Sequence, residues 1–208
     1  TDYINSFDSD GFTHGGNGTI GRDDVNYVAW NWFAGNTALG TGDFTQGTIA
    51  STCRRNVDAG FSIVLYTGQS GNQTIGHGLS KAPEVVLVKN RDESGDEWAM
   101  YHASNTSAPE TDYLRLDTTA ATADNIFWND TAPSATVFYV DDTRVTNSGH
   151  GSDYVAYCFH SVDGYSKMGS YTGNGNVDGT FVYTGFRPAY VMIRYTDVGS
   201  WLIYDTKR

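Results

Sequence analysis

Three tryptophans are the side chains that could bind a ligand, because a planar aromatic ring can stack on the face of a sugar. Trp98 and Trp201 occupy equivalent positions in two similar stretches, EWAMYH (97–102) and SWLIYD (200–205). Recurrence at one position favours packing in a core over ligand binding. Trp128 stands in IFWNDTAP beside a polar turn, so it is the better candidate for an exposed binding platform, with core packing as the alternative.

Other chemistry-bearing residues form no recognisable catalytic motif. The five histidines never stand at metal-ligand spacing, and the G-x-S-x-G pattern of a nucleophile elbow is missing. The 24 Asp and Glu residues leave a glycosidase pair of carboxylates open, but most stand in turns, where Asp caps the backbone. The stretch DSDG at Asp8–Gly11 begins like a calcium loop but lacks its later acidic ligands, which favours a plain turn. We therefore expect no enzyme activity, no cofactor and no metal site.

Cysteine is rare in this chain. Two cysteines, Cys53 and Cys158, are too few for a disulfide-framework fold or a cysteine-based zinc site. Two reduced, partly buried thiols are the first interpretation, and a disulfide between them is the alternative.

The composition is typical of a β protein. Of 208 residues, 39% are hydrophobic, and 14 Tyr, 10 Phe and 5 Trp can fill a sizeable core. The chain also has 24 Gly against only 4 Pro, and the turn formers Asn, Asp, Ser and Thr are plentiful.

The charge balance excludes some partners. The formal net charge is −11, and no basic stripe exists to neutralise phosphates, so nucleic-acid binding is not expected. An acidic surface repels anionic membranes, and apolar runs such as Val85–Val88 are too short to insert into one.

Part of the sequence is repeated within the chain. YTG at Tyr66 returns at Tyr171, and PEVVLVK at Pro83 returns as PAYVMIR at Pro188, both with an offset of 105 residues. A shared offset in two separate blocks indicates an internal repeat.

The other half of the repeat recurs towards the N-terminus. DDVNYVAWNW at 23–32 matches HGSDYVAYCFH at 150–160. We therefore expect one complete unit at residues 60–163, flanked by a back half at 1–59 and a front half at 164–208. The two halves can complete a second unit, within one chain or head-to-tail between neighbouring chains. The alternative is that the boundaries of the chain simply fall within a repeat.

The apolar residues alternate with a period of two. In DYVAYCFH, Tyr154, Ala156 and Cys158 face one way while the residues between them face the other, and 23–32 alternates alike. Strands at spacings of about 10–15 residues, separated by Gly-, Asn- and Asp-rich turns, predict an all-β antiparallel sandwich built from a duplicated unit of about 105 residues.

The quoted repeat blocks, together with TDYLRLDTTAA and SYTGNGN, resemble an uncharacterised repeat domain of tail-fibre and other virion proteins of aquatic bacteriophages, cyanophages included. The resemblance covers nearly the whole chain. It implies a jelly-roll or concanavalin-like β-sandwich that serves as a structural or host-attachment module. It transfers no functional residue.

Three functions are therefore weighed. The first is a non-enzymatic virion protein in a tail fibre, decoration or filament, located on the virion or outside the cell, with other copies and other virion proteins as partners. The second is a carbohydrate-binding module that contacts host-surface glycans. The third is a depolymerase that cleaves such glycans.

Overall fold

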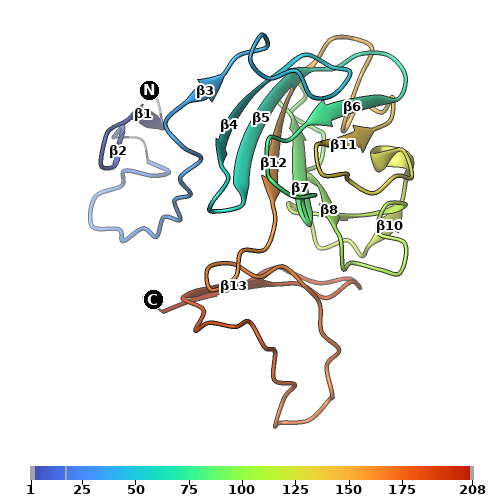
Figure 1. Ribbon diagram of the computed structural model, residues 1–208. Helices are drawn as coiled ribbons and strands as arrows, with labels where there is room; N and C mark the ends of the chain where they lie inside the picture. Colours follow the sequence, from blue (N-terminus) through green and yellow to red (C-terminus); the bar gives the residue numbers. More distant parts are fainter. Residues whose placement is uncertain (1–2, 17, 207–208) are drawn as a thin grey trace. The chain divides into compact units, whose positions relative to one another are not determined.

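The computed structural model describes residues 3–16 and 18–206, and within them it is an all-β protein with antiparallel sheets (Figure 1). The chain divides into two compact units, residues 1–32 and residues 33–208. The described residues contain no helix long and apolar enough to cross a membrane.

In the described residues of the smaller unit, β1 (Ile4–Phe7) and β2 (Phe12–His14) form a hairpin. Asp8 shapes its turn: the Asp8 amide donates to the carbonyl of Gly11, and the Asp8 carboxylate accepts from Thr13 Oγ1 at 2.8 Å. DSDG is therefore a turn, as its sequence predicts. The prediction of a strand at residues 23–32 is wrong, because residues 25–32 form no strand in the structure. Alternation alone does not make a strand, since the backbone also needs a neighbouring strand for its ladder of hydrogen bonds.

The larger unit is organised around one eight-stranded sheet with the order β10-β9-β8-β7-β12-β5-β4-β3. Its strands are β3 (Ala38–Leu39), β4 (Ser51–Asn56), β5 (Phe61–Thr67), β7 (Val85–Asn90), β8 (Ala99–His102), β9 (Asp112–Arg115), β10 (Ala123–Asp124) and β12 (Asp153–Phe159). Because β3 and β4 extend the sheet beyond β5, it runs across the expected boundary between residues 59 and 60.

The central strand β12 confirms the predicted alternation of faces. Tyr154, Ala156 and Cys158 are fully buried, whereas the residues between them are half-buried. Tyr154 stacks on Tyr66 of β5 with 5.1 Å between ring centroids. The side chains on this face of the sheet therefore form part of the main hydrophobic core.

A second layer covers that core face. It consists of β6 (Gln73–Gly76) paired with β11 (Val137–Val140), together with the 3-10 turn η1 (Ile126–Trp128), which precedes β11 in the chain. Ile75, Phe138 and Val140 pack into the same buried cluster as residues of β5 and β7. Two packed antiparallel layers make the fold sandwich-like.

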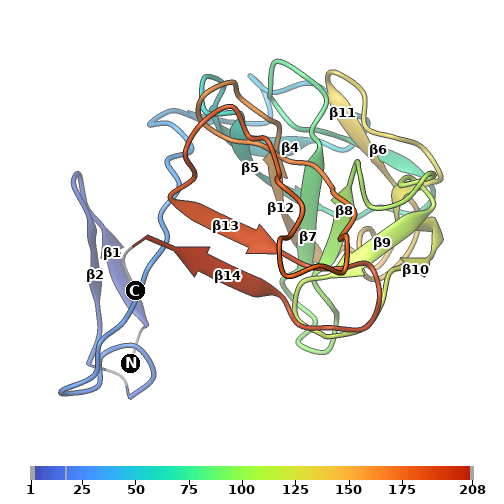
Figure 2. The same cartoon turned by 90° about the horizontal axis from the view of Figure 1, so that it is seen from below.

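A separate two-stranded sheet follows, made of β13 (Tyr190–Ile193) and β14 (Leu202–Asp205) (Figure 2). Tyr190 pairs with Asp205 and Ile193 with Leu202. The hairpin β7–β8 has the same register at the matching positions of its sequence, where Val85 pairs with His102. Similar sequences therefore pair alike in the two hairpins.

Candidate functional site

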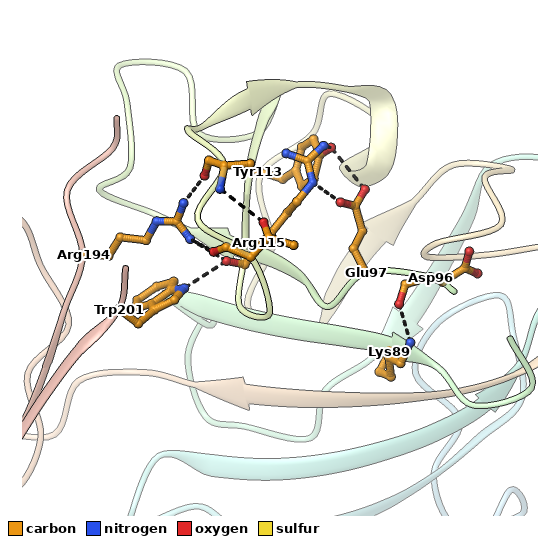
Figure 3. A network of polar contacts seen from close by, with 9 residues as sticks. Lys89, Asp96, Glu97, Tyr113, Arg115, Arg194 and Trp201 are labelled. Carbon is orange, nitrogen blue, oxygen red and sulfur yellow. Dashed lines mark hydrogen bonds and ion pairs between the residues drawn. The ribbon is translucent and has the colours of Figure 1, made fainter. Parts of the chain in front are cut away.

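The most developed cluster of polar contacts lies where residues next to β13 and β14 meet the chain around β9 and β10 (Figure 3). Arg194, directly after β13, donates from Nη1 to the carbonyls of Arg115 at 2.7 Å and Thr118 at 2.8 Å. Its Nη2 donates to the carbonyl of Ala120. A planar guanidinium suits this task because its donors point in several fixed directions. We call this cluster the hairpin joint.

Trp201, directly before β14, completes the hairpin joint. Its Nε1 donates to the carbonyl of Arg115 at 2.9 Å, and its ring lies 5.3 Å from the guanidinium carbon of Arg194. The ring also packs with Met168 against Val85 and Leu114 on the second face of the eight-stranded sheet. Burial beside Arg115 lowers the pKa of Arg194, first through desolvation and then through the like charge.

An ion pair lies on the other side of Arg115. Its guanidinium contacts the Glu97 carboxylate and the Tyr113 hydroxyl, and it lies 4.6 Å from the centre of the Tyr113 ring. Desolvation, followed by the charge of Glu97, raises the pKa of Tyr113 to about 12. The phenol therefore stays protonated, and it donates to Glu97 Oε1 at 3.2 Å. This arrangement links the chain just before β8 to β9.

A polar groove of about 370 Å³ lies beside this ion pair. The buried carboxylate of Asp96 forms an ion pair with Arg144 at 2.7 Å, and the Asp96 carbonyl accepts from Lys89 Nζ. The groove is lined by Gly95, Asp96, Glu97, Asp117, Thr118, Arg144 and Val145. Its size and polar lining suit a small hydrophilic group.

Trp128 is not the exposed platform that its polar neighbours suggested. Only 2% of its surface is exposed, and its Nε1 donates to the carbonyl of Asp112 at 3.1 Å. Its ring meets Tyr101 edge to face inside the main core. Asp130 in the following turn is exposed, but Trp128 at the end of η1 is buried. Trp128 is therefore a core residue, which corrects the first interpretation.

Trp98 and Trp201 are half-buried. Trp98 stacks against Tyr157 of β12 with 6.1 Å between ring centroids. Both tryptophans thus pack against neighbouring side chains at matching positions of their hairpins, in line with the structural interpretation of their recurrence.

Cys53 and Cys158 are buried free thiols in the structure. They lie on β4 and β12, the two strands that flank β5. Two strand spacings amount to about 10 Å, whereas the Cα atoms of a disulfide lie within about 7 Å. Burial raises the pKa of the Cys53 thiol to about 11 and that of Cys158 further.

His77 is fully buried and structural. Its Nδ1 accepts from the amide of Leu79 at 3.1 Å, so its Nε2 carries the proton that goes to the carbonyl of Ser134 at 3.2 Å. Burial lowers the pKa of His77 to about 4. No group of three His, Cys, Asp or Glu side chains in the described part of the chain is arranged to hold a metal ion.

The contacts of Arg194 were missed by sequence reasoning, and a weak signal could have found them. Arg194 is the counterpart of Lys89 in the repeat, and both are basic residues that donate to backbone carbonyls. Lys89 caps its own loop, however, whereas Arg194 reaches residues 74 to 79 positions earlier in the chain. Only the folded structure reveals that difference.

The fold and the hairpin joint define a sandwich-like, antiparallel all-β protein that carries a docked second hairpin. Residues 1–208 match a family model described as a domain of unknown function, DUF7483, and the protein belongs to that family. No curated protein and no solved structure matches the chain.

Proposed function

We propose that this protein is a non-enzymatic structural module of a bacteriophage virion, in a tail fibre, decoration or filament, and that it contributes to attachment to the host surface. Its partners are other copies of the chain and other virion proteins, outside the cell. The resemblance of the repeat blocks to phage virion proteins supports the setting.

The observation that carries the proposal is the common register of β7–β8 and β13–β14. Two hairpins with similar sequence and identical pairing are expected if one sandwich unit of about 105 residues is duplicated along the chain. The unit is then a jelly-roll or concanavalin-like sandwich. Repeated units present several equivalent weak sites, so avidity can replace strong binding at any single site.

Exposed aromatic side chains favour glycans as the host ligand. Phe181 is 86% exposed and Tyr183 is 77% exposed, on a loop that precedes β13. Neighbouring exposed rings on a loop offer flat apolar faces on which a sugar ring can stack. Carbohydrate binding is thus the proposed means of attachment, and glycan cleavage remains the alternative.

Binding to host cells tests this function. The labelled 208-residue protein is titrated onto aquatic bacteria, cyanobacteria included, with and without enzymatic removal of their surface polysaccharide. We expect saturable binding that falls on polysaccharide removal and on Tyr183→Ala, while the fully exposed control Val177→Ala binds normally. Binding to no strain would contradict the attachment role. Release of reducing ends from the polysaccharide would replace it with the depolymerase alternative.

A further inference from the structure

Three separate segments of the larger unit line the polar groove beside Glu97. They are residues 95–97 between β7 and β8, residues 117–118 after β9, and residues 144–145 between β11 and β12. The groove volume of about 370 Å³ lies near the lower end of the range of about 300–1,000 Å³ that is usual for ligand sites. Because its lining residues are charged or small, hydrogen bonds rather than ring stacking would hold a ligand there.

Buried polar side chains hold Arg144 in place at this groove. Its carbonyl accepts from the Tyr154 hydroxyl at 2.7 Å and from Asn90 Nδ2 at 2.9 Å. Its Nη2 pairs with Asp96 Oδ1 at 2.7 Å, and Asn90 also donates to the other Asp96 oxygen at 3.1 Å. The side chain of Asp96 is only 1% exposed, whereas that of Arg144 is 65% exposed. Three buried residues thus fix the backbone and the guanidinium of one exposed arginine.

This support leaves Arg144 able to bind a ligand. A buried carboxylate is costly unless it is paired, so Asp96 keeps the guanidinium in a defined position. Such support from a second layer of residues is what a precise binding site requires. A guanidinium has several N–H donors, so the contact with Asp96 leaves others for a ligand. The exposed carboxylate of Asp117 supplies hydrogen-bond acceptors in the same groove.

We propose that the groove binds one uncharged sugar residue of a host-surface glycan, with Arg144 donating to its hydroxyl groups and Asp117 accepting from them. A sugar hydroxyl both donates and accepts, so neighbouring hydroxyl groups suit a groove that offers both kinds of partner. The inference rests on the glycan attachment proposed above. It adds a hydrogen-bonding site to the exposed rings of Phe181 and Tyr183.

The charges at the groove disfavour acidic sugars. Asp96 pairs with Arg144, and Glu97 pairs with Arg115 (Figure 3). Asp117 therefore leaves the groove with a negative charge, in a chain whose formal net charge is −11. A uronic acid would bring a second carboxylate into this groove, and like charges repel. We expect an uncharged hexose to bind better than the matching uronic acid.

NMR titration of the isotope-labelled 208-residue protein tests the site. The probes are the methyl glycosides of glucose, galactose and mannose and of the matching uronic acids. They are added up to tens of millimolar, because one hydrogen-bonded ring binds weakly. We expect saturable shifts of the Gly95, Thr118 and Val145 amide signals with at least one hexoside. The dissociation constant of the matching uronide should be about fivefold higher.

Gly95→Leu fills the groove without straining the backbone. A Cβ at Gly95 meets no atom within 4 Å, so the new side chain enters open space. The ligand-induced shifts of Thr118 and Val145 should disappear. In the matched control, Gly42→Leu, the added Cβ also meets no atom within 4 Å, and Gly42 does not line the groove. This control should bind the hexoside as the parent does.

Asp117→Asn tests the selection by charge. The amide keeps an oxygen that accepts a hydrogen bond but removes the negative charge. We expect the fivefold preference for the hexoside to shrink to about twofold or less. An unchanged preference in this variant contradicts the role of Asp117, and a uronide that binds the parent as tightly as its hexoside contradicts the selection against acidic sugars.

Two results overturn the groove site itself. One is the absence of a saturable shift with every hexoside, and the other is the same shifts in Gly95→Leu as in the parent. Host-cell binding, measured on the same variants, keeps this inference separate from the proposed function. Cells that bind Gly95→Leu as well as the parent, with no hexoside bound at the groove, contradict the groove site alone. Hexoside binding at the groove without binding to any strain contradicts the attachment role alone.

Discussion

Arg194 and Trp201 converge on a single atom, the carbonyl oxygen of Arg115, at 2.7 Å and 2.9 Å. Arg194 directly follows β13 and Trp201 directly precedes β14, and the acceptor lies at the end of β9. Backbone contacts beside them, from the amide of Gly199 to the carbonyl of Thr119 and from the amide of Thr122 to the carbonyl of Thr196, fasten the same two regions. The hairpin joint therefore helps to hold β13–β14 to the sandwich.

Arg194→Ala should release that hairpin while leaving the sandwich folded. The change removes three charge-assisted hydrogen bonds, each of which contributes about 1.5–3 kcal/mol when one partner is charged. Hydrogen–deuterium exchange should rise across residues 190–205 and stay unchanged in β5 and β12. Arg187→Ala, at an exposed arginine of the same segment, is the control. Faster exchange throughout the chain would show that the joint supports the whole fold.

Trp128 should behave as a core residue in unfolding experiments. Trp128→Ala should lower the free energy of unfolding by about 3–5 kcal/mol, because it leaves a cavity in the main core. Trp128→Phe should cost less, since it keeps most of the ring and loses the bond to the Asp112 carbonyl. Urea denaturation measures both, with the exposed Tyr183→Ala expected within about 0.5 kcal/mol of the parent. If Trp128→Ala is as stable as the parent and binds glycans more weakly, Trp128 is a ligand-binding residue after all.

The thiols of Cys53 and Cys158 should not react with a thiol reagent in the folded protein, and both should react after unfolding. Both are buried, and burial raises the pKa of each, so little reactive thiolate forms at neutral pH. A disulfide-exchange reagent should detect no thiol in the native protein. In denaturant without reductant it should detect the two cysteines of the chain. Zero thiols after unfolding would demonstrate the disulfide.

Acidification should destabilise the protein through His77. The unfolded chain binds a proton on this imidazole near pH 6.5, whereas the folded protein binds it only near pH 4, so stability is lost as the pH falls between these values. The full difference corresponds to about 3 kcal/mol. Denaturant unfolding at several pH values between 7 and 4.5 should give a shallower dependence on pH for His77→Gln. The slope is the readout, because lost packing lowers stability equally at every pH. An unchanged slope would contradict the role of His77.

Local pattern alone predicted much of the sandwich. The period of two in DYVAYCFH predicted which side chains of β12 enter the core, and Tyr154, Ala156 and Cys158 are buried accordingly. The turn at Asp8 follows from its own short side chain, which bonds to residues close by in the chain. Such features need no information from distant residues.

Three other features depended on tertiary structure. Trp128 stands in a polar stretch yet is buried, because η1 turns its ring towards Tyr101. Residues 27–32 have the alternation of β12 and still form no strand, because alternation of side chains does not by itself set the hydrogen bonds of the backbone. Trp201 and Arg115 are 86 residues apart and share a hydrogen bond that the sequence around either residue does not predict. The β class, the turns and the inward faces of the strands follow from local backbone preference and alternation, so the amino-acid sequence predicts them. Which strands pair and which polar atoms meet depends on residues far apart along the chain, so these contacts appear only in the folded protein.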